Sequence, residues 1–174
     1  IFLDSDGVLN VALLRDEKPV APTTVTELII PAEVKPSLDR LKAADYLLIC
    51  VTNKPDVERG FMTQAAVDAI CNKLRLDLPL DDIFICYSEK SDGYKPKPGL
   101  ILDATKKYHI DLTQSYMIGD RWRDVEAGKS AGCKTIWIDR GYVHDKIPSP
   151  AADFTAHSLK EAAAWILMPP TPAT

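Results

Sequence analysis

The sequence lacks the features of a nucleic-acid-binding or membrane protein. Its 174 residues carry a formal net charge of −4 and contain no run of basic residues, so a nucleic acid or an anionic membrane is a poor candidate partner. No apolar stretch approaches the length that a transmembrane helix requires. We find no signal peptide and no internal repeat, although the sequence begins within a predicted strand, so residues upstream of it are left open.

Cysteine and histidine are scarce, and their spacing fits neither a disulfide framework nor a cluster of metal ligands. The cysteines are Cys50, Cys71, Cys86 and Cys133, and the histidines are His109, His144 and His157. No C-x-x-C pair is present, and two of the cysteines lie in apolar strand-like runs, where buried free thiols are common. We therefore expect a reducing, cytoplasmic setting without disulfides, and histidines that lie at the surface or in loops rather than acting as bases.

Strand-like and helical patterns alternate along the chain. Apolar runs predict strands over residues 1–3, 46–51, 82–86, 115–120 and 135–139, and helical spacing or capping signals predict helices at 32–44, after Thr63, around Ile101, over 122–132 and after Ser158. Alternation of this kind predicts an α/β domain in three layers, a Rossmann-like parallel sheet with helices on both faces. We expect one domain over residues 1–167 and a disordered tail over residues 168–174.

Residues 11–31 interrupt this alternation without a clear periodicity of their own. The segment contains three prolines and a β-rich patch at residues 23–30, and the segment as a whole is a candidate small hairpin between the first strand and the first helix. Irregular insertions at the carboxyl end of a strand often act as lids or substrate loops. This insertion is too short to form a separate cap domain, so we expect no large cap over the site.

The first predicted strand ends in two carboxylates one residue apart. In an extended chain residues i and i+2 point the same way, so Asp4 and Asp6 can face one cleft, and Gly7 permits a sharp turn directly after them. Two carboxylates at the end of a buried strand are costly without a positive charge between them, and Mg²⁺ with oxygen ligands is the simplest partner. The alternative is an ordinary surface turn, since Asp and Gly dominate turns.

Other polar residues follow the remaining predicted strands. In parallel sheets ligands bind at the carboxyl ends of the strands, so residues distant in sequence are expected at one edge. The residues placed there are Asp4, Asp6, Thr52, Asn53, Lys95, Asp120 and Asp124. Each alone has a simpler explanation: a threonine at a strand end, a solvated lysine, or acids that favour a helix N-terminus. Because all of these residues follow predicted strands in this order along the chain, we favour one site that they share.

These residue types suit phosphoryl transfer. Asp4 would attack phosphorus, and Asp6 would protonate the departing alcohol and later activate water. Mg²⁺ would lie between Asp4, the phosphate and Asp120. Thr52 and Lys95 would hold the phosphate oxygens, and Asp124, four residues after Asp120, would orient Lys95 or a water on the metal.

Four segments resemble the motifs of the haloacid dehalogenase-like (HAD) hydrolase superfamily. They are Asp4-Ser5-Asp6-Gly7-Val8, Thr52-Asn53, Lys95-Pro96-Lys97-Pro98-Gly99 and Gly119-Asp120-Arg121-Trp122-Arg123-Asp124. The chain is similar to the capless branch of heptose 1,7-bisphosphate and histidinol-phosphate phosphatases. The resemblance implies a nucleophile at Asp4, an acid/base at Asp6, phosphate contacts from Thr52 and Lys95, and a metal ligand at Asp120.

By the same resemblance, Asp6 contributes its backbone carbonyl to the metal. From its spacing after Asp120, we also include Asp124 among the residues around the metal. Substrate contacts are expected from Asn53, Tyr94 and Arg121. Arg121 and Arg123 are candidates for a second anionic group on the substrate, although two arginines at a helix start are more often only solvated.

The sequence departs from this branch in three places. Ser5 stands between the two aspartates where the branch usually has arginine, and Tyr94 precedes the motif lysine where the branch tends to have arginine. The branch often has a zinc loop with two cysteine-containing pairs, of which only Cys86 is present here. One thiol cannot form a tetrahedral zinc site, so we predict no zinc. These changes leave the phosphatase chemistry intact but weaken the heptose bisphosphate assignment.

We therefore expect a Mg²⁺-dependent phosphatase that forms an aspartyl-phosphate and acts on a small phosphorylated metabolite, such as a heptose bisphosphate. One alternative is a histidinol-phosphate-type phosphatase or another phosphatase of the same branch. A second is a phosphate-binding regulatory domain without turnover, which would have no need for an acid/base at Asp6. A sugar-phosphate mutase would need a cap or lid to keep water out, and no segment supplies one. The oligomeric state is left open.

Overall fold

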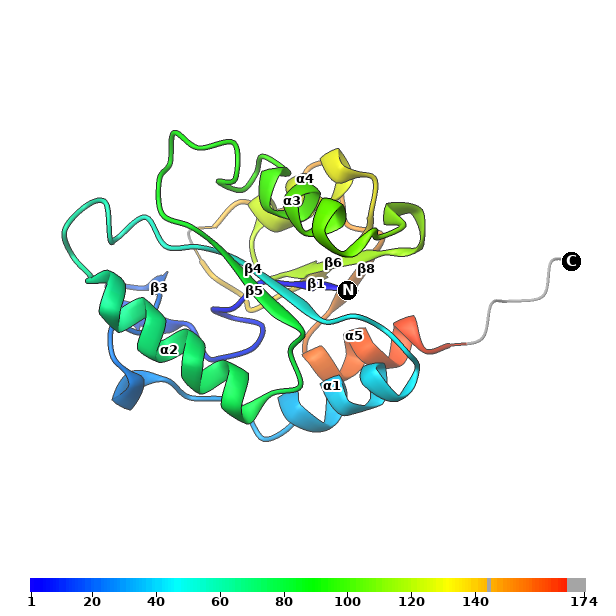
Figure 1. Cartoon of the computed structure of the whole chain (residues 1–174), viewed down its shortest axis with the longest axis horizontal. Helices are drawn as coiled ribbons and strands as arrows, with labels where there is room; N and C mark the ends of the chain where they lie inside the picture. The colour runs from blue at the N-terminus through cyan, green and yellow to red at the C-terminus, as the bar shows by residue number, and fades with distance from the viewer. Residues whose placement is uncertain (144, 169–174) are drawn as a thin grey trace, which may run out of the picture.

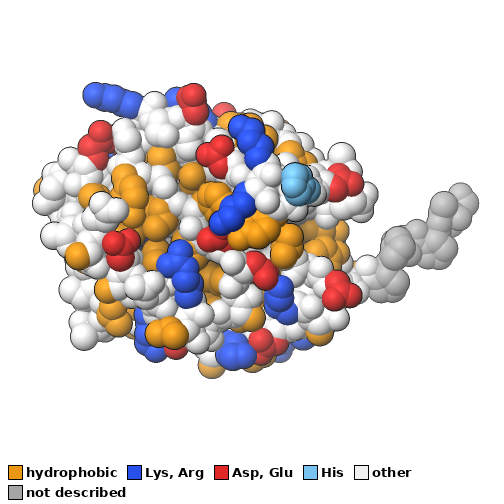
Figure 2. Space-filling model, in the orientation of Figure 1, with side chains coloured by type: hydrophobic (Ala, Val, Ile, Leu, Met, Phe, Trp, Pro, Cys, Tyr) orange, Lys and Arg blue, Asp and Glu red, His pale blue; other side chains and the backbone are white. Residues whose placement is uncertain are grey.

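The computed structural model describes residues 1–143 and 145–168. His144 and residues 169–174 lie outside the described part, so the prediction of a disordered tail is not assessed beyond Met168. Within the described part, none of the helices is long and apolar enough to cross a membrane. On the face drawn in Figure 2, acidic and basic side chains are interspersed, and no stripe of basic side chains crosses it.

A six-stranded parallel sheet forms the centre of the molecule, which confirms the predicted α/β class (Figure 1). Its strands run in the order β5–β4–β1–β6–β7–β8. Their bounds are β1 Phe2–Leu3, β4 Ile49–Asn53, β5 Asp82–Cys86, β6 Tyr116–Gly119, β7 Lys134–Ile138 and β8 Phe154–Ala156. The sequence analysis missed β8 because its three residues include only one buried side chain, Ala156, and therefore form no apolar run.

Helices cover both faces of the sheet. They are α1 Val34–Ala43, α2 Gln64–Asp77, α3 Gly99–Tyr108, α4 Trp122–Ala131 and α5 Leu159–Ile166, with 3₁₀ turns η1 Val25–Glu27 and η2 Leu112–Gln114. The hydroxyl of Thr63 accepts the Ala66 N–H at 3.1 Å and begins α2 as predicted. Ser158 caps α5 through the Glu161 N–H, but the Glu161 carboxylate accepts from His157 N–H instead of completing the predicted capping box at Ser158.

The pleat of the strands divides the core into two layers. Phe2 packs with α3 and α4, whereas its neighbour Leu3 packs with α1, α2 and α5 on the opposite face. In β6 the adjacent residues Met117 and Ile118 are divided between the two layers in the same way. Both faces of the central strands are therefore buried, as their continuous apolar runs predict.

The insertion after β1 contains a small hairpin, as expected for residues 11–31. Strands β2 (Leu13–Arg15) and β3 (Lys18–Val20) pair antiparallel around a two-residue turn at Asp16 and Glu17, both with positive φ. The β-rich patch at residues 23–30 lies outside the hairpin and contains η1. Local capping stabilises this turn, because the Glu27 carboxylate accepts both the N–H and the hydroxyl of Thr23.

Helix α4 packs so closely on β6 and β7 that only glycine fits at position 128. A Cβ there would lie 2.6 Å from Met117 Cβ and 2.8 Å from Thr135 Cγ2. We predict that Gly128→Ala lowers the free energy of unfolding by about 1–3 kcal/mol through overpacking, even though alanine is the better helix former. Urea denaturation checks this value. Ser130→Ala, on the exposed face of the same helix, should change it by less than about 0.5 kcal/mol. An unchanged or higher stability for Gly128→Ala would contradict the packing described here.

Candidate active site

The turn after β1 places two aspartates at the carboxyl edge of the sheet. The N–H groups of Leu9 and Asn10 both donate to the Ser5 carbonyl, at 2.8 and 3.1 Å, which folds the chain back directly after the strand. Gly7 adopts a φ of 87° in this turn, and a Cβ at this position would lie 1.9 Å from Asp120 Oδ2. The glycine therefore lets the turn approach Asp120 closely.

Three buried carboxylates meet at this edge. Asp4, Asp120 and Asp124 each offer an oxygen within 4.8 Å of the others, and in the described part of the chain this is the one group of three or more acids, cysteines or histidines so arranged. Burial, and then the neighbouring acids, raise the pKa of Asp120 well above its usual range. Burial likewise raises the pKa of Asp4 to about 6, against the opposing charge of Lys95.

One oxygen of this cluster has no partner. Asp120 Oδ1 is buried and makes no hydrogen bond with any residue that the structure describes. An unpaired carboxylate oxygen beside two further acids is unfavourable without a cation. An all-oxygen set of carboxylates is the donor chemistry that Mg²⁺ prefers, so the residues present fit this ion.

Lys95 is the buried cation that the structure places against two of the three acids. Its Nζ donates to Asp4 Oδ1 at 2.7 Å and to the Val51 carbonyl at 2.8 Å, and it lies 2.7 Å from Asp124 Oδ1. All three ammonium protons therefore have acceptors. Burial alone would lower the pKa of Lys95, but the charges of Asp124 and Asp4 raise it well above its usual range. Lys95 stays charged and fixes the orientation of both carboxylates.

Two residues predicted to contact substrate or phosphate are engaged with the protein itself. The side chain of Asn53 brackets the backbone of Lys95, accepting its N–H and donating to its carbonyl, both at 3.1 Å. The Thr52 hydroxyl lies 2.8 Å from the Ser5 hydroxyl. Both residues line the cleft, but in this arrangement Asn53 positions the lysine loop, and Thr52 is joined to the residue between the two aspartates.

Asp6 has a different partner from Asp4. Its Oδ2 lies 2.5 Å from the Nζ of Lys54, and its Oδ1 accepts from the Asn10 amide at 3.0 Å. Burial alone would raise the pKa of Asp6, but the charge and hydrogen bond of Lys54 hold it below its usual value. The sequence analysis gave Lys54 no role. Its position directly after Thr52-Asn53, at the end of a buried strand, was the available signal.

A second missed group lies at the end of β7 and in the segment that follows it. The Trp137 indole donates to the Asp120 carbonyl at 3.0 Å, and the Tyr142 hydroxyl donates to Asp120 Oδ2 at 2.8 Å. Arg140 Nε donates to the Gly7 carbonyl at 2.8 Å. Burial and the charge of Asp120 raise the pKa of Tyr142, so its hydroxyl remains a donor. No motif in the sequence connects these residues to residue 120.

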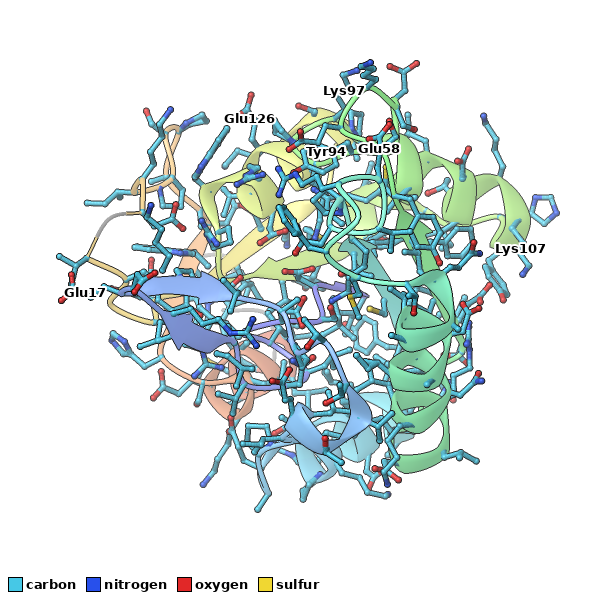
Figure 3. The ribbon with its side chains drawn as sticks, turned by 90° about the vertical axis from the view of Figure 1, so that its left-hand side faces the viewer. Glu17, Glu58, Tyr94, Lys97, Lys107 and Glu126 are labelled. Carbon is cyan, nitrogen blue, oxygen red and sulfur yellow. The ribbon has the colours of Figure 1, made fainter. Side chains whose placement is uncertain are left out.

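A cleft of about 350 Å³ opens above the acids. Figure 3 views the molecule from this side, with the hairpin turn at Glu17 and the loops that carry Glu58 and Tyr94 around the edge. Three arginines line the cleft. Arg59 pairs with Asp56 and Glu89, and Arg121 pairs with Asp145. Arg123 instead donates to the Tyr94 hydroxyl at 3.0 Å, and no carboxylate among the described residues pairs with it.

Comparisons with known proteins agree with this geometry. A family model described as HAD-hydrolase-like matches residues 94–162. The D-glycero-β-D-manno-heptose-1,7-bisphosphate 7-phosphatase of Pasteurella multocida is 33% identical, over 92% of this chain and 92% of the relative. The enzyme of the same name from Haemophilus ducreyi is 30% identical, over 95% of this chain and 97% of the relative.

Solved structures give the same result. The D,D-heptose 1,7-bisphosphate phosphatase of B. bronchiseptica, complexed with magnesium and phosphate, superposes with a TM-score of 0.80 at 25% identity, over 96% of this chain and 97% of that one. The enzyme of that name from Burkholderia thailandensis supports the fold alone, with a TM-score of 0.69 at 20% identity over 97% of each chain. The chain therefore belongs to the HAD-like hydrolases, in the branch of the heptose bisphosphate phosphatases, and is a phosphatase.

Proposed function

We propose that the protein is a Mg²⁺-dependent phosphomonoesterase that forms an aspartyl-phosphate on Asp4 and acts on a small phosphorylated sugar. The observation that carries this proposal is the buried triad of carboxylates with one lysine and one unpaired oxygen. The similar B. bronchiseptica enzyme, described as complexed with magnesium and phosphate, supports the choice of ion.

The residues proposed to hold the ion are Asp4 and Asp120, with the backbone carbonyl of Asp6. Both oxygens of Asp124 are engaged, one with Lys95 and one with the Arg121 N–H at 3.0 Å, so its main role is to hold the lysine. When bound, Mg²⁺ neutralises charge on the phosphate and reduces its repulsion from the attacking carboxylate.

Asp4 is the proposed nucleophile. Lys95 holds its Oδ1, which leaves Oδ2 to attack phosphorus as the bond from phosphorus to the leaving oxygen breaks. The product of this step is a phosphoryl group on Asp4 and a free alcohol. Water then attacks the same phosphorus, the bond from phosphorus to Oδ2 of Asp4 breaks, and inorganic phosphate and the Asp4 carboxylate are the products. Lys95 can contact the phosphate only by giving up one of its three present acceptors, so its constant role is to orient Asp4.

Asp6 is the proposed acid and base. It lies two residues from Asp4, and its bond to Lys54 keeps it ionised before substrate binds. In this form it can accept the proton of the water that hydrolyses the aspartyl-phosphate. Before the first step it must take up a proton, from solvent or from the monoanionic form of the phosphate ester, which it then delivers to the departing alkoxide; an alkyl phosphate requires this proton and an aryl phosphate does not.

The rim of the cleft favours a substrate with a second anionic group. Arg123 lines the cleft, and no described carboxylate neutralises it, whereas Arg59 and Arg121 are both paired with acids. Tyr94 occupies the position before the motif lysine and holds the Arg123 guanidinium. A guanidinium placed in this way suits a phosphate. A sugar bisphosphate, with heptose 1,7-bisphosphate as the first candidate, therefore fits better than a monophosphate.

Replacing Asp6 tests the covalent mechanism. We predict that Asp6→Asn lowers steady-state hydrolysis of p-nitrophenyl phosphate by about 10²–10³-fold, since the base for the second step is lost. The first step persists because p-nitrophenolate leaves without a proton, so Asp6→Asn should accumulate a phosphoryl group on Asp4. Mass spectrometry after an acid quench detects it.

The matched control is Asp4→Asn, which removes the nucleophile and should give neither product nor phosphorylated protein. An active wild-type enzyme with no trapped phosphoryl group in Asp6→Asn would argue against the covalent route. A wild-type protein that shows no hydrolysis with Mg²⁺ would point to the regulatory domain instead.

Arg123→Gln tests the substrate class. We predict that wild type has a lower KM for D-glycero-D-manno-heptose 1,7-bisphosphate than for the 7-monophosphate, and that the substitution reduces this preference about tenfold. The reason is the loss of one charged hydrogen bond, worth about 1.5–3 kcal/mol. Steady-state kinetics with both substrates measures the ratio. The control Arg75→Gln, on the exposed side of α2, should leave the ratio of the two KM values unchanged. If Arg123→Gln and wild type have the same ratio, Arg123 does not contribute to substrate recognition.

A further inference from the structure

Residues 137–142, at the end of β7 and directly after it, contact Asp120 and the turn that faces it. Trp137 fixes the backbone of Asp120 through its carbonyl, and Tyr142 binds the carboxylate oxygen Oδ2 at 2.8 Å. Arg140 of the same segment holds the Gly7 carbonyl, and Gly7 itself packs against the Asp120 carboxylate. Three side chains from six residues thus converge on one aspartate and the turn that faces it.

Tyr142 is itself held in place by the residue next to Asp120. The Arg121 guanidinium lies 5.8 Å from the centre of the Tyr142 ring, at cation–π distance. The same guanidinium pairs with Asp145, three residues after Tyr142. The loop that carries Tyr142 is therefore tied back to residues 120 and 121, which limits where the hydroxyl can lie.

This arrangement makes the two oxygens of Asp120 unequal. Oδ2 accepts the Tyr142 hydroxyl, whereas Oδ1 is buried without a hydrogen bond. A carboxylate without a hydrogen-bond partner turns over a broad range about its last side-chain bond. The bond to Tyr142 restricts this torsion angle and leaves the other oxygen, Oδ1, without a competing donor.

We propose that Tyr142 is a positioning residue that orients Asp120 for the magnesium ion. The inference rests on the metal site of the proposed function and adds a residue outside the four motifs. The hydroxyl acts through Asp120 and does not itself touch the ion or the substrate. Partners of this kind, which orient a ligand from behind, typically change metal affinity 10- to 100-fold when they are removed.

The surroundings of Tyr142 set the size of the expected effect. A cavity of about 240 Å³, lined by Asp120, Trp137, Arg140 and Tyr142 among others, lies behind the carboxylate. Loss of the hydroxyl lets water from this cavity reach Oδ2, so the carboxylate keeps a donor but loses its fixed orientation. We therefore expect an effect at the lower end of that range.

The test compares Tyr142→Phe with Tyr108→Phe. Tyr108 makes the same type of bond, donating to Asp82 Oδ2 at 3.0 Å, but at the amino end of β5 and away from the cleft. Isothermal titration calorimetry with MgCl₂ should show an affinity about tenfold weaker for Tyr142→Phe and unchanged for Tyr108→Phe. The melting temperature in EDTA should be close to that of wild type for Tyr142→Phe.

A second readout separates positioning from loss of the site. For Tyr142→Phe, the Mg²⁺ concentration that gives half-maximal hydrolysis of p-nitrophenyl phosphate should rise about tenfold, while kcat recovers at saturating Mg²⁺ because the ligands are intact. Wild-type Mg²⁺ affinity in Tyr142→Phe would overturn this inference and leave the proposed function standing. A variant that is unfolded in EDTA would also overturn it, because Tyr142 would then be structural. A wild-type protein that binds no Mg²⁺ would overturn the metal site on which both depend.

Discussion

The arrangement of the site depends on the repulsion among three buried carboxylates and on the single lysine that offsets part of it. Lys95 lies 2.7 Å from both Asp4 and Asp124, but it leaves Asp120 without a cationic partner. Three acids with one cation carry an excess of negative charge in a region with little water, which is unfavourable until a further cation is bound. The same excess of charge is what would favour the binding of the proposed Mg²⁺ at this edge.

This constraint explains why the backbone at the edge contains glycine. The acids can approach one another only if the strand ends that carry them also approach. A Cβ at Gly7 would overlap Asp120, and one at Gly119 would lie 2.0 Å from Asp124 Cβ. Glycine at these positions costs conformational entropy on folding. Glycine at these positions lowers the stability of the fold but allows the acids to lie close together. Such local costs are common at binding and catalytic sites.

The sequence was sufficient for the features that local spacing determines. The i, i+2 spacing predicted that Asp4 and Asp6 can share a cleft. The positions of the strand ends and the parallel topology predicted that the acids meet at the carboxyl edge of the sheet. The partners of those acids were harder to predict. Lys54 and Tyr142 reach Asp6 and Asp120 across 48 and 22 residues, through a fold that brings together segments with no common pattern. A lysine after a strand, or a tyrosine in a loop, has many more common explanations, so only the three-dimensional arrangement distinguishes these two.

The two aspartates that follow β1 lie two residues apart but have opposite proposed roles. Lys54 holds the pKa of Asp6 below its usual value, whereas burial and the neighbouring acids raise the pKa of Asp4 despite Lys95. Without an ion, this order is the reverse of what an ionised nucleophile and a proton donor require. A cation held by this group of acids would favour the ionised form of Asp4, whereas Asp6, whose side chain bonds to Lys54, would gain less from it. In the proposed mechanism, Asp4 and Asp120 would therefore bind the ion that keeps Asp4 ionised for its role as the nucleophile.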